Sequence, residues 1–288
     1  MYERRPIVVE VLSAGLQTSI QDLGRVGWRA AGVPVSGAMD RVSAIFANKL
    51  LNNSPRVAII EFAWPAPVFQ FHKAATIAVV GADCCPRVND VEYPSRSVLS
   101  LKARDILSFK PAKIGFWGYL AIKSGWQSEV SLGSRSQYVG VTPRSKLASG
   151  DTLAIATQSE LATAPYSSVK MNVSHFSTAK LCVDQGPEWD RLPQRAKDLL
   201  IGRPLEISSQ SNRMAYLIKS RLNYGAPEII TSPVQPGTVQ LTPSGNCIVL
   251  MRDAQTTGGY ARVLQLPEIS ISQLSQKKLG SPVEFILK

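Results

Sequence analysis

Short apolar runs broken by turn residues dominate this chain. In the first half they are IVVEVLSAG, ATIAVVGADC, SVLSLKARDILSF, GYLAIKSG and DTLAIATQ. In the second half they are AKLCVDQG, LEISSQ, EIITSPV, GTVQLTP, NCIVLMRD and PVEFILK. Gly, Pro, Asn or Ser bounds each run, which is typical of strands joined by close turns. The pattern therefore predicts a mainly β protein built as barrels or sandwiches, not a doubly wound sheet.

Two segments have helical spacing instead. Residues 36–51 offer Ser36 as N-cap, with apolar residues on one face and a stop at residues 52–55. That face consists of Met39, Val42, Ile45, Phe46 and Leu50. Residues 187–201 place acids early, and Gly202 and Pro204 follow their apolar stripe. That stripe consists of Leu192, Ala196, Leu199 and Leu200.

One helix in each strand-rich half predicts two subdomains. We expect the first over residues 1–156 and the second over 175–288, and the pattern leaves open whether they interleave. The polar stretch at residues 157–174 has little pattern and is the predicted linker or long loop.

Composition limits the function classes. With 44% hydrophobic and 18% charged residues, the 288-residue chain is expected to bury a sizeable core. Its formal charge of +11 favours an anionic partner. The Lys and Arg residues are scattered, however, with no zinc-finger spacing or basic helix, so we expect no nucleic acid partner.

Cysteine and histidine usage points to a cytoplasmic protein without a metal site. The four cysteines show no disulfide framework, and the only histidines, His72 and His175, lie in no metal-binding motif. A Ser-His-Asp triad is equally unsupported. Neither a signal-peptide pattern nor a run of roughly 18 apolar residues is present, so we expect no membrane association.

Four segments carry more polar and glycine residues than turns need. Residues 15–40 combine five glycines with Asp22 and Arg25, which could bind a carboxylate or phosphate. In the same segment the polar groups also include Gln17, Thr18, Gln21 and Arg29. Residues 133–138, GSRSQY, could bind an oxyanion. In each case a purely structural turn remains the alternative.

The other two segments follow strands. Residues 208–216 offer two amides and a guanidinium, from Gln210, Asn212 and Arg213. Residues 251–262, MRDAQTTGGYAR, offer Asp253 as a base or orienting group. A tight loop whose side chains cap its own backbone is the structural alternative. No GxxxxGK[ST] phosphate loop occurs anywhere in the chain.

Together these segments resemble a known family. The motifs are TSIQDLGRVGWR, SGAMD followed by ANKLLNN, LGSRSQY, SSQSNRM and GTVQLTPSGNCIVLMRDAQTTGGYAR. They resemble the KipA family, also called the C subunit of the bacterial ATP-dependent 5-oxoprolinase. That family is related to allophanate hydrolase subunit 2 and to the carboxyltransferase domain of urea carboxylase. Two departures from the family pattern are Ser124-Gly125 after the YLA strand and Ala261 in GGYAR.

The resemblance implies two cyclophilin-like β-barrel subdomains of a carboxyltransferase-like module. It also implies a complex with two further proteins, a KipI-like B subunit plus a LamB/YcsF-like A subunit. Such a complex opens 5-oxoproline to glutamate at the expense of ATP, bound with Mg. Phosphorylation of the amide oxygen would turn that oxygen of an unstrained lactam into a leaving group. Such transfer relies on positioning and charge stabilisation, which suits arginines and glycine-rich loops.

Residue type then suggests roles within this resemblance. Arg25 and Arg213 would stabilise an anion, and Asp253 would orient or deprotonate. The expected substrate-binding residues are Asp22, Gln210, Asn212, Gln255, Thr256, Thr257, Gly258, Gly259 and Tyr260. We expect these loops to meet in one cleft, where Asp253→Asn or Arg213→Ala would leave the fold nearly intact.

Two rival functions remain. A carboxyltransferase-type protein would pass a carboxyl group from biotin to a urea-like amide, with biotin carried by another protein because this chain has no MKM sequence. A regulator would only bind a KipI-like kinase inhibitor, without catalysis.

Overall fold

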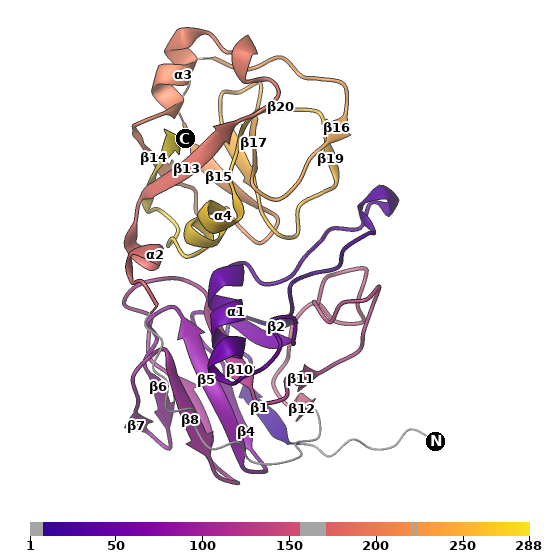
Figure 1. The fold of residues 1–288 in the computed structure, drawn as a ribbon, viewed down its shortest axis with the longest axis vertical. Coiled ribbons are helices and arrows are strands. Elements are labelled where there is room, and N and C mark those ends of the chain that lie inside the picture. Colours follow the sequence, from indigo (N-terminus) through magenta and orange to yellow (C-terminus); the bar gives the residue numbers. More distant parts are fainter. Residues whose placement is uncertain (1–7, 156–170, 221, 223) are drawn as a thin grey trace. The chain divides into compact units, whose positions relative to one another are not determined.

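The computed structural model describes residues 8–155, 171–220, 222 and 224–288, which form two compact units (Figure 1). The first unit contains the described residues up to Arg25 and those from Asp40 to Val173. The second contains Val26–Met39 and Ser174–Lys288. Thus Val26–Met39, early in the chain, packs with the C-terminal half. Most of the linker predicted at 157–174 lies outside the described residues.

The first unit consists of two antiparallel sheets. In the seven-stranded sheet the order is β11-β12-β1-β4-β9-β6-β7. Its strands are β1 (Val9–Ser13), β4 (Val68–Phe71), β6 (Pro86–Val88), β7 (Val91–Glu92), β9 (Ile106–Phe109), β11 (Trp126–Gln127) and β12 (Thr152–Ile155). In the five-stranded sheet the order is β2-β3-β10-β5-β8. Its strands are β2 (Gln17–Gln21), β3 (Ile59–Ala63), β5 (Ala75–Gly81), β8 (Ser97–Leu101) and β10 (Gly118–Ile122).

One hydrophobic core joins these two sheets. Phe71 of β4 and Leu120 of β10 are both fully buried in it. The rings of Phe62 in β3 and Phe109 in β9 lie 4.6 Å apart between centroids. One face of each sheet lies in this shared core, where burial of apolar area stabilises the unit, and strands β3, β5 and β10 are buried along their whole length.

The second unit is a closed barrel. Its strands follow the order β13-β20-β17-β18-β15-β14-β21. They are β13 (Lys180–Gln185), β14 (Pro204–Ile207), β15 (Ala215–Lys219), β17 (Thr238–Leu241), β18 (Cys247–Leu250), β20 (Ala261–Gln265) and β21 (Pro282–Leu287). Parallel pairing of β13 with β21 closes the ring. A separate ribbon joins β16 (Ser232–Pro233) to β19 (Thr257–Gly258).

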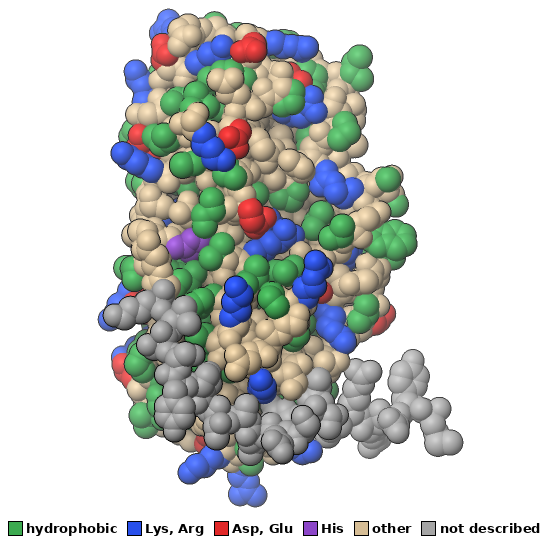
Figure 2. All heavy atoms as spheres, viewed as in Figure 1, with side chains coloured by type: hydrophobic (Ala, Val, Ile, Leu, Met, Phe, Trp, Pro, Cys, Tyr) green, Lys and Arg blue, Asp and Glu red, His purple; other side chains and the backbone are tan. Residues whose placement is uncertain are grey.

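The prediction of a mainly β fold with short helices is confirmed. Closure into a barrel is observed in the second unit, whereas the first unit is formed by its two sheets. In the described residues no helix is long and apolar enough to cross a membrane. On the face drawn in Figure 2, Lys and Arg side chains are dispersed among other side chains rather than gathered in one basic patch.

The predicted helix at 36–51 begins later than expected. Helix α1 spans Arg41–Leu50, and its N-cap is Asp40, whose carboxylate accepts a hydrogen bond from the Ser43 N–H at 3.0 Å. Ser36 is therefore not the cap. Ser36 and Gly37 both have positive φ, 55° and 91°, and this left-handed backbone cannot continue a right-handed helix.

The predicted helix at 187–201 is interrupted. A 3-10 turn, η2 (Trp189–Arg191), precedes α3 (Gln194–Leu200), with Pro193 as the N-cap of α3. Leu192 between them is extended, with ψ 134°. A proline disfavours helical backbone in the residue before it, and this breaks the continuous helix.

The remaining helical segments were not predicted. They are η1 (Arg29–Ala31), α2 (Ser174–Ser177) and α4 (Glu268–Ser275). In α4 the sequence EISISQLS alternates apolar and polar residues as a strand would. Its serines are nevertheless buried, and the Ser270 hydroxyl donates to the Cys182 carbonyl oxygen at 2.8 Å.

Candidate functional site

In the first unit Asp22 connects two of the motif segments. Its carboxylate accepts hydrogen bonds from the hydroxyls of Ser134 and Ser136, at 2.7 and 2.6 Å, and from the Arg135 N–H at 2.7 Å. It also accepts from the Gly24 N–H at 2.7 Å. The QDLGR and GSRSQY segments, more than a hundred residues apart, therefore form one structure around this carboxylate. A substrate-binding role for Asp22 stays a prediction.

Arg25 belongs to the same structure. It is 1% exposed and donates a hydrogen bond to the Ser136 carbonyl oxygen. This side chain is therefore part of the packed loop in its unit. Its predicted role in anion stabilisation stays a prediction, as does the meeting of QDLGR with the loops of the second unit in one cleft.

In the second unit Arg213 and Asp253 form an ion pair. Nε of Arg213 lies 2.8 Å from Oδ2 of Asp253, and Nη2 lies 3.2 Å from Oδ1. Both side chains are only 10% exposed. The structure thus brings together the two predicted catalytic residues of the SSQSNRM and DAQTTGGYAR segments. Their charges compensate each other, so removing either one would leave a largely buried charge.

The same two segments hold the SGAM segment. Arg213 donates to the Gly37 carbonyl oxygen at 2.8 Å, and Nε of Arg252 lies 3.3 Å from the Met39 carbonyl oxygen. The Ser36 N–H donates to the Arg252 carbonyl oxygen at 2.9 Å. Arg252, 1% exposed, also pairs with Glu268, with 3.0 Å between Nη1 and Oε2. The SSQSNRM, MRDAQTTGGYAR and SGAM segments therefore pack together in the second unit.

The other predicted residues of SSQSNRM lie at the surface. Asn212 is exposed, and its side-chain oxygen accepts from the Met214 N–H at 2.8 Å, which is a local capping bond. Gln210 is also exposed. The backbone-capping alternative describes Asn212 in this structure, and substrate binding by either residue stays a prediction.

The loop at residues 255–260 is tied to its neighbours through its backbone. The Thr256 carbonyl oxygen accepts from the Val234 N–H at 3.0 Å, and that of Gly259 from the Ile229 N–H at 2.8 Å. The Tyr260 carbonyl oxygen accepts from the Gln240 amide at 3.3 Å. The hydroxyls of Thr256 and Thr257 form no hydrogen bond with any described residue. They therefore do not cap this backbone.

The two glycines of this loop differ in what they permit. A Cβ on Gly258 would lie 2.6 Å from Nε2 of Gln240, whereas one on Gly259 would meet only the Ile229 carbonyl oxygen at 3.5 Å. A Cβ at position 258 would therefore displace the end of the Gln240 side chain, whereas nothing in the space around Gly259 demands a glycine.

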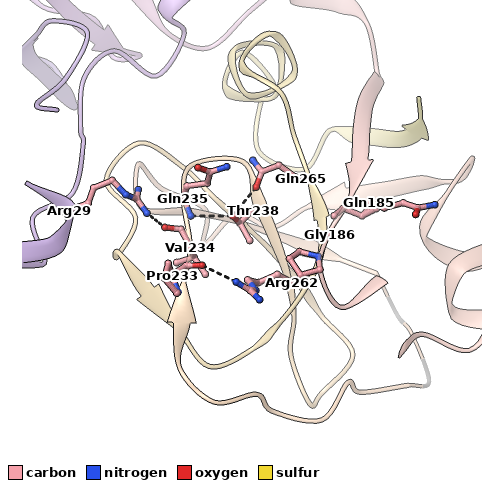
Figure 3. Close-up of a pocket in the computed structure, with 11 residues that line it drawn as sticks. Arg29, Gln185, Gly186, Pro233, Val234, Gln235, Thr238, Arg262 and Gln265 are labelled. Atoms are coloured by element: carbon pink, nitrogen blue, oxygen red, sulfur yellow. Dashed lines mark hydrogen bonds between the residues drawn. The ribbon is translucent and has the colours of Figure 1, made fainter. Parts of the chain in front are cut away.

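A pocket of about 330 Å³ opens in the second unit (Figure 3). Its lining comes from four places: η1, the turn after β13, the segment before and into β17, and strand β20. The lining residues are Arg29, Gln185, Gly186, Pro187, Pro233, Val234, Gln235, Thr238, Arg262, Leu264 and Gln265. None of the predicted substrate-loop residues 255–260 is among them, although Arg262 from the same motif is.

Arg262, one of the lining residues, is paired with Glu188. Its Nε and Nη2 lie 2.9 and 2.8 Å from the two carboxylate oxygens of Glu188, and its Nη1 donates to the Pro233 carbonyl oxygen. The Arg262 guanidinium lowers the pKa of Glu188, and the carboxylate in turn raises the pKa of Arg262. Nothing in the sequence pattern suggests pairing these residues, because Glu188 is explained as an acid in the first turn of the predicted helix.

Arg29 differs from the other arginines of the second unit named above. It donates one hydrogen bond, to the Val234 carbonyl oxygen (Figure 3). Among the described residues no carboxylate pairs with it. A half-buried guanidinium beside a pocket without a carboxylate partner attracts anions.

Comparison with known proteins decides the family. Residues 31–287 match the family described as carboxyltransferase domain, subdomain A and B. The chain belongs to this carboxyltransferase-domain family. It is also 30% identical to the C subunit of 5-oxoprolinase from Escherichia coli, over 97% of this chain and 91% of that protein. The resemblance inferred from the motifs is confirmed.

Two further relatives match this chain over only part of their own length. Urea amidolyase of Lachancea kluyveri is 26% identical over 99% of this chain, which spans 17% of that protein. The crystal structure of TTHA0988 superimposes with a TM-score of 0.88 and 25% identity; the match covers 99% of this chain and 56% of that one. The family match therefore covers residues 31–287, and the structural similarity covers nearly the whole chain.

Metal ligation finds no support within the described ranges. No group of three or more His, Cys, Asp or Glu side chains there could hold a metal ion. The chemistry these residues offer is charge compensation and anion binding through arginines.

Proposed function

We propose that this chain is the C subunit of an ATP-dependent 5-oxoprolinase that converts 5-oxoproline to glutamate. The observation that carries the proposal is its 30% identity to the Escherichia coli protein over nearly the full length of both. The motifs behind the resemblance also form packed assemblies here, around Asp22 in one unit and around the Arg213–Asp253 pair in the other.

The proposal includes a complex with the KipI-like and the LamB/YcsF-like proteins. An interface of standard size buries on the order of 800 Å² per partner and needs apolar side chains at its centre. Val26 and Ile230 of the second unit, 78% and 92% exposed, are apolar side chains of this kind. The four free cysteines of the chain suit the reducing cytoplasm, and we place the complex there.

Three buried or half-buried arginines of the second unit are not available as a cradle for the triphosphate of ATP. Arg213, Arg252 and Arg262 are each held by a carboxylate, those of Asp253, Glu268 and Glu188. The pocket of about 330 Å³ is at the small end of the roughly 300–1,000 Å³ typical of ligand sites, which suits a small acid. We therefore place ATP and its magnesium on the partner proteins and assign no phosphoryl-transfer step to this chain.

The catalytic roles predicted for Arg25, Arg213 and Asp253 are part of the proposal only in a restricted form. Asp253 could act as a base, and Arg213 as an anion ligand, only if their ion pair opened in the assembled complex. In the arrangement described here the pair positions the SGAM segment.

Co-expression of this chain with its two partners tests the proposal. The purified complex should release ADP only when 5-oxoproline is present, with glutamate formed in equal amount. Omission of this chain should abolish both products. A complex that hydrolyses no ATP in response to 5-oxoproline would refute the proposed function.

The similarity to urea amidolyase favours a second candidate, transfer of a carboxyl group from biotin to a urea-like amide. The biotin would be carried by another protein, so the same complex with a biotinylated carrier and urea should then show transfer. Binding of a KipI-like protein without either activity would support the regulatory alternative.

A further inference from the structure

Most polar groups that line the pocket of the second unit already have partners. Arg262 is held by Glu188, and the Thr238 hydroxyl donates to the Gln265 side-chain oxygen at 2.9 Å. The Gln265 amide donates to the carbonyl oxygens of Pro236 and Leu266. These groups fix the wall of the pocket and leave little capacity for a ligand.

Besides the exposed Gln185, two side chains in the pocket retain such capacity. Arg29 uses one N–H for the Val234 carbonyl oxygen, and a guanidinium has five. The side-chain amide of Gln235 is exposed and has no hydrogen-bond partner in the described part of the chain. Figure 3 shows both at the same end of the pocket, with Gln185 at the other end.

The backbone holds this end of the pocket in place. Val234, which accepts from Arg29, is 2% exposed and packs with Leu250 and Ala254. Its N–H donates to the Thr256 carbonyl oxygen, and the Gln235 N–H donates to the Thr238 hydroxyl at 3.2 Å. The TTGGY loop therefore supports Val234, whose carbonyl oxygen Arg29 contacts, and Thr238 supports the backbone of Gln235.

We propose that this pocket binds a small carboxylic acid that also carries an amide, with Arg29 on the carboxylate and Gln235 on the amide. A guanidinium offers two parallel N–H groups to a carboxylate, and a primary amide can both accept from a lactam N–H and donate to its carbonyl. The inference rests on the proposed function, since 5-oxoproline is a molecule of this kind.

Calorimetric titration of the full chain tests the assignment. The ligands are 5-oxoproline, 2-pyrrolidone, which is the same lactam without the carboxylate, and inorganic phosphate. Arg29→Gln should weaken 5-oxoproline binding about 10- to 100-fold, as loss of a charged hydrogen bond does, and Arg29→Lys should weaken it less. 2-Pyrrolidone should bind at least about 10-fold more weakly than the acid.

Two matched variants complete the design. Gln235→Ala removes the amide at an exposed position, so it should lower affinity for both lactams while the fold is kept. Arg203→Gln removes an exposed arginine outside the pocket and should change nothing. No binding of 5-oxoproline to the wild-type chain, or equal affinity in Arg29→Gln, would overturn the proposal. Tighter binding of phosphate than of 5-oxoproline would overturn the assignment to a carboxylic acid.

The outcomes separate the pocket from the proposed function. If the complex hydrolyses ATP in response to 5-oxoproline but Arg29→Gln binds the acid normally, the pocket is wrong and the function stands. If the full chain binds the acid through Arg29 but the complex has no such activity, the pocket stands and the function is wrong.

Discussion

Two arginines line the same pocket with opposite consequences. Arg262 faces Glu188, and their bidentate contact cancels its charge, whereas among the described residues Arg29 hydrogen-bonds to one backbone carbonyl oxygen and to no carboxylate. The Arg213–Asp253 pair follows the pattern of Arg262. The comparison teaches that an arginine in a motif does not by itself indicate an anion site: what matters is whether the fold already supplies its carboxylate. By this criterion the paired arginines build the unit, and Arg29 binds the ligand.

The largest loss of folding stability is expected when the Arg213–Asp253 ion pair is broken. Arg213→Met should lower the free energy of unfolding by roughly 3–5 kcal/mol, because the Asp253 carboxylate stays largely buried without its partner. The sequence alone predicts instead that replacing Arg213 or Asp253 leaves the fold nearly intact. Urea unfolding of the full chain measures it, with the exposed Arg203→Met as control. Equal, small losses in both variants would show that the pair is not structural.

A smaller loss is expected for the second paired arginine. Arg262→Met removes the two charged hydrogen bonds to Glu188, but this carboxylate keeps the hydrogen bond from the backbone N–H of residue 262, so the loss should be about 1.5–3 kcal/mol. Arg262→Lys should recover only part of it, because an ammonium cannot form the bidentate contact. The same unfolding measurement checks both variants, and full recovery by lysine would contradict the bidentate account.

The contribution of the Arg262–Glu188 pair to folding stability should depend on pH. Since Arg262 lowers the pKa of Glu188 in the folded protein, the pair stabilises the fold above the ordinary glutamate pKa of about 4.3. That stability is lost as the pH falls through the lowered, folded-state pKa. The difference in unfolding free energy between wild type and Glu188→Gln should therefore shrink from about pH 6 to about pH 3. A difference that stays constant over this range would exclude the ionised pair as its source.

The smallest effect on stability is expected for Arg29. Arg29→Gln removes one hydrogen bond to a carbonyl oxygen and breaks no ion pair among the described residues, so the loss should be about 1 kcal/mol or less. Thermal unfolding beside Arg262→Met measures this. If Arg29→Gln unfolds as readily as Arg262→Met, Arg29 belongs to the structural group and the comparison fails.

Short apolar runs were enough to predict strands such as β1, β5, β13 and β21, because strand patterning is a local property, but β2, β3, β4, β15 and β20 were not among the predicted runs. The helix boundaries failed where one residue overrides the pattern: left-handed Gly37 at one helix and Pro193 at the other. Helix α4 (Glu268–Ser275) was missed because its Ile-Ser alternation imitates a strand, and its buried serines find partners only through tertiary contacts.

The candidate site likewise combines features that residue type predicts with features that only the folded chain reveals. Residue type drew attention to Arg213 and Asp253, but it could not show that they pair, since they lie 40 residues apart and meet only in the folded unit. Glu188 was missed because an acid at the start of a helical pattern has a sufficient local explanation. Arg29 was noted only as one polar group among several, since the lack of a carboxylate partner for it among the described residues is a property of the fold.

The most direct test of the central claim is the steady-state kinetics of the assembled complex with Arg29→Gln beside Arg203→Gln. If Arg29 binds the substrate carboxylate, its replacement should raise KM for 5-oxoproline by about 10-fold or more with kcat changed by less than about 3-fold, since uniform binding is lost. Arg203→Gln should match the wild type. An unchanged KM in Arg29→Gln would contradict the claim that the unpaired arginine is the one that binds the ligand.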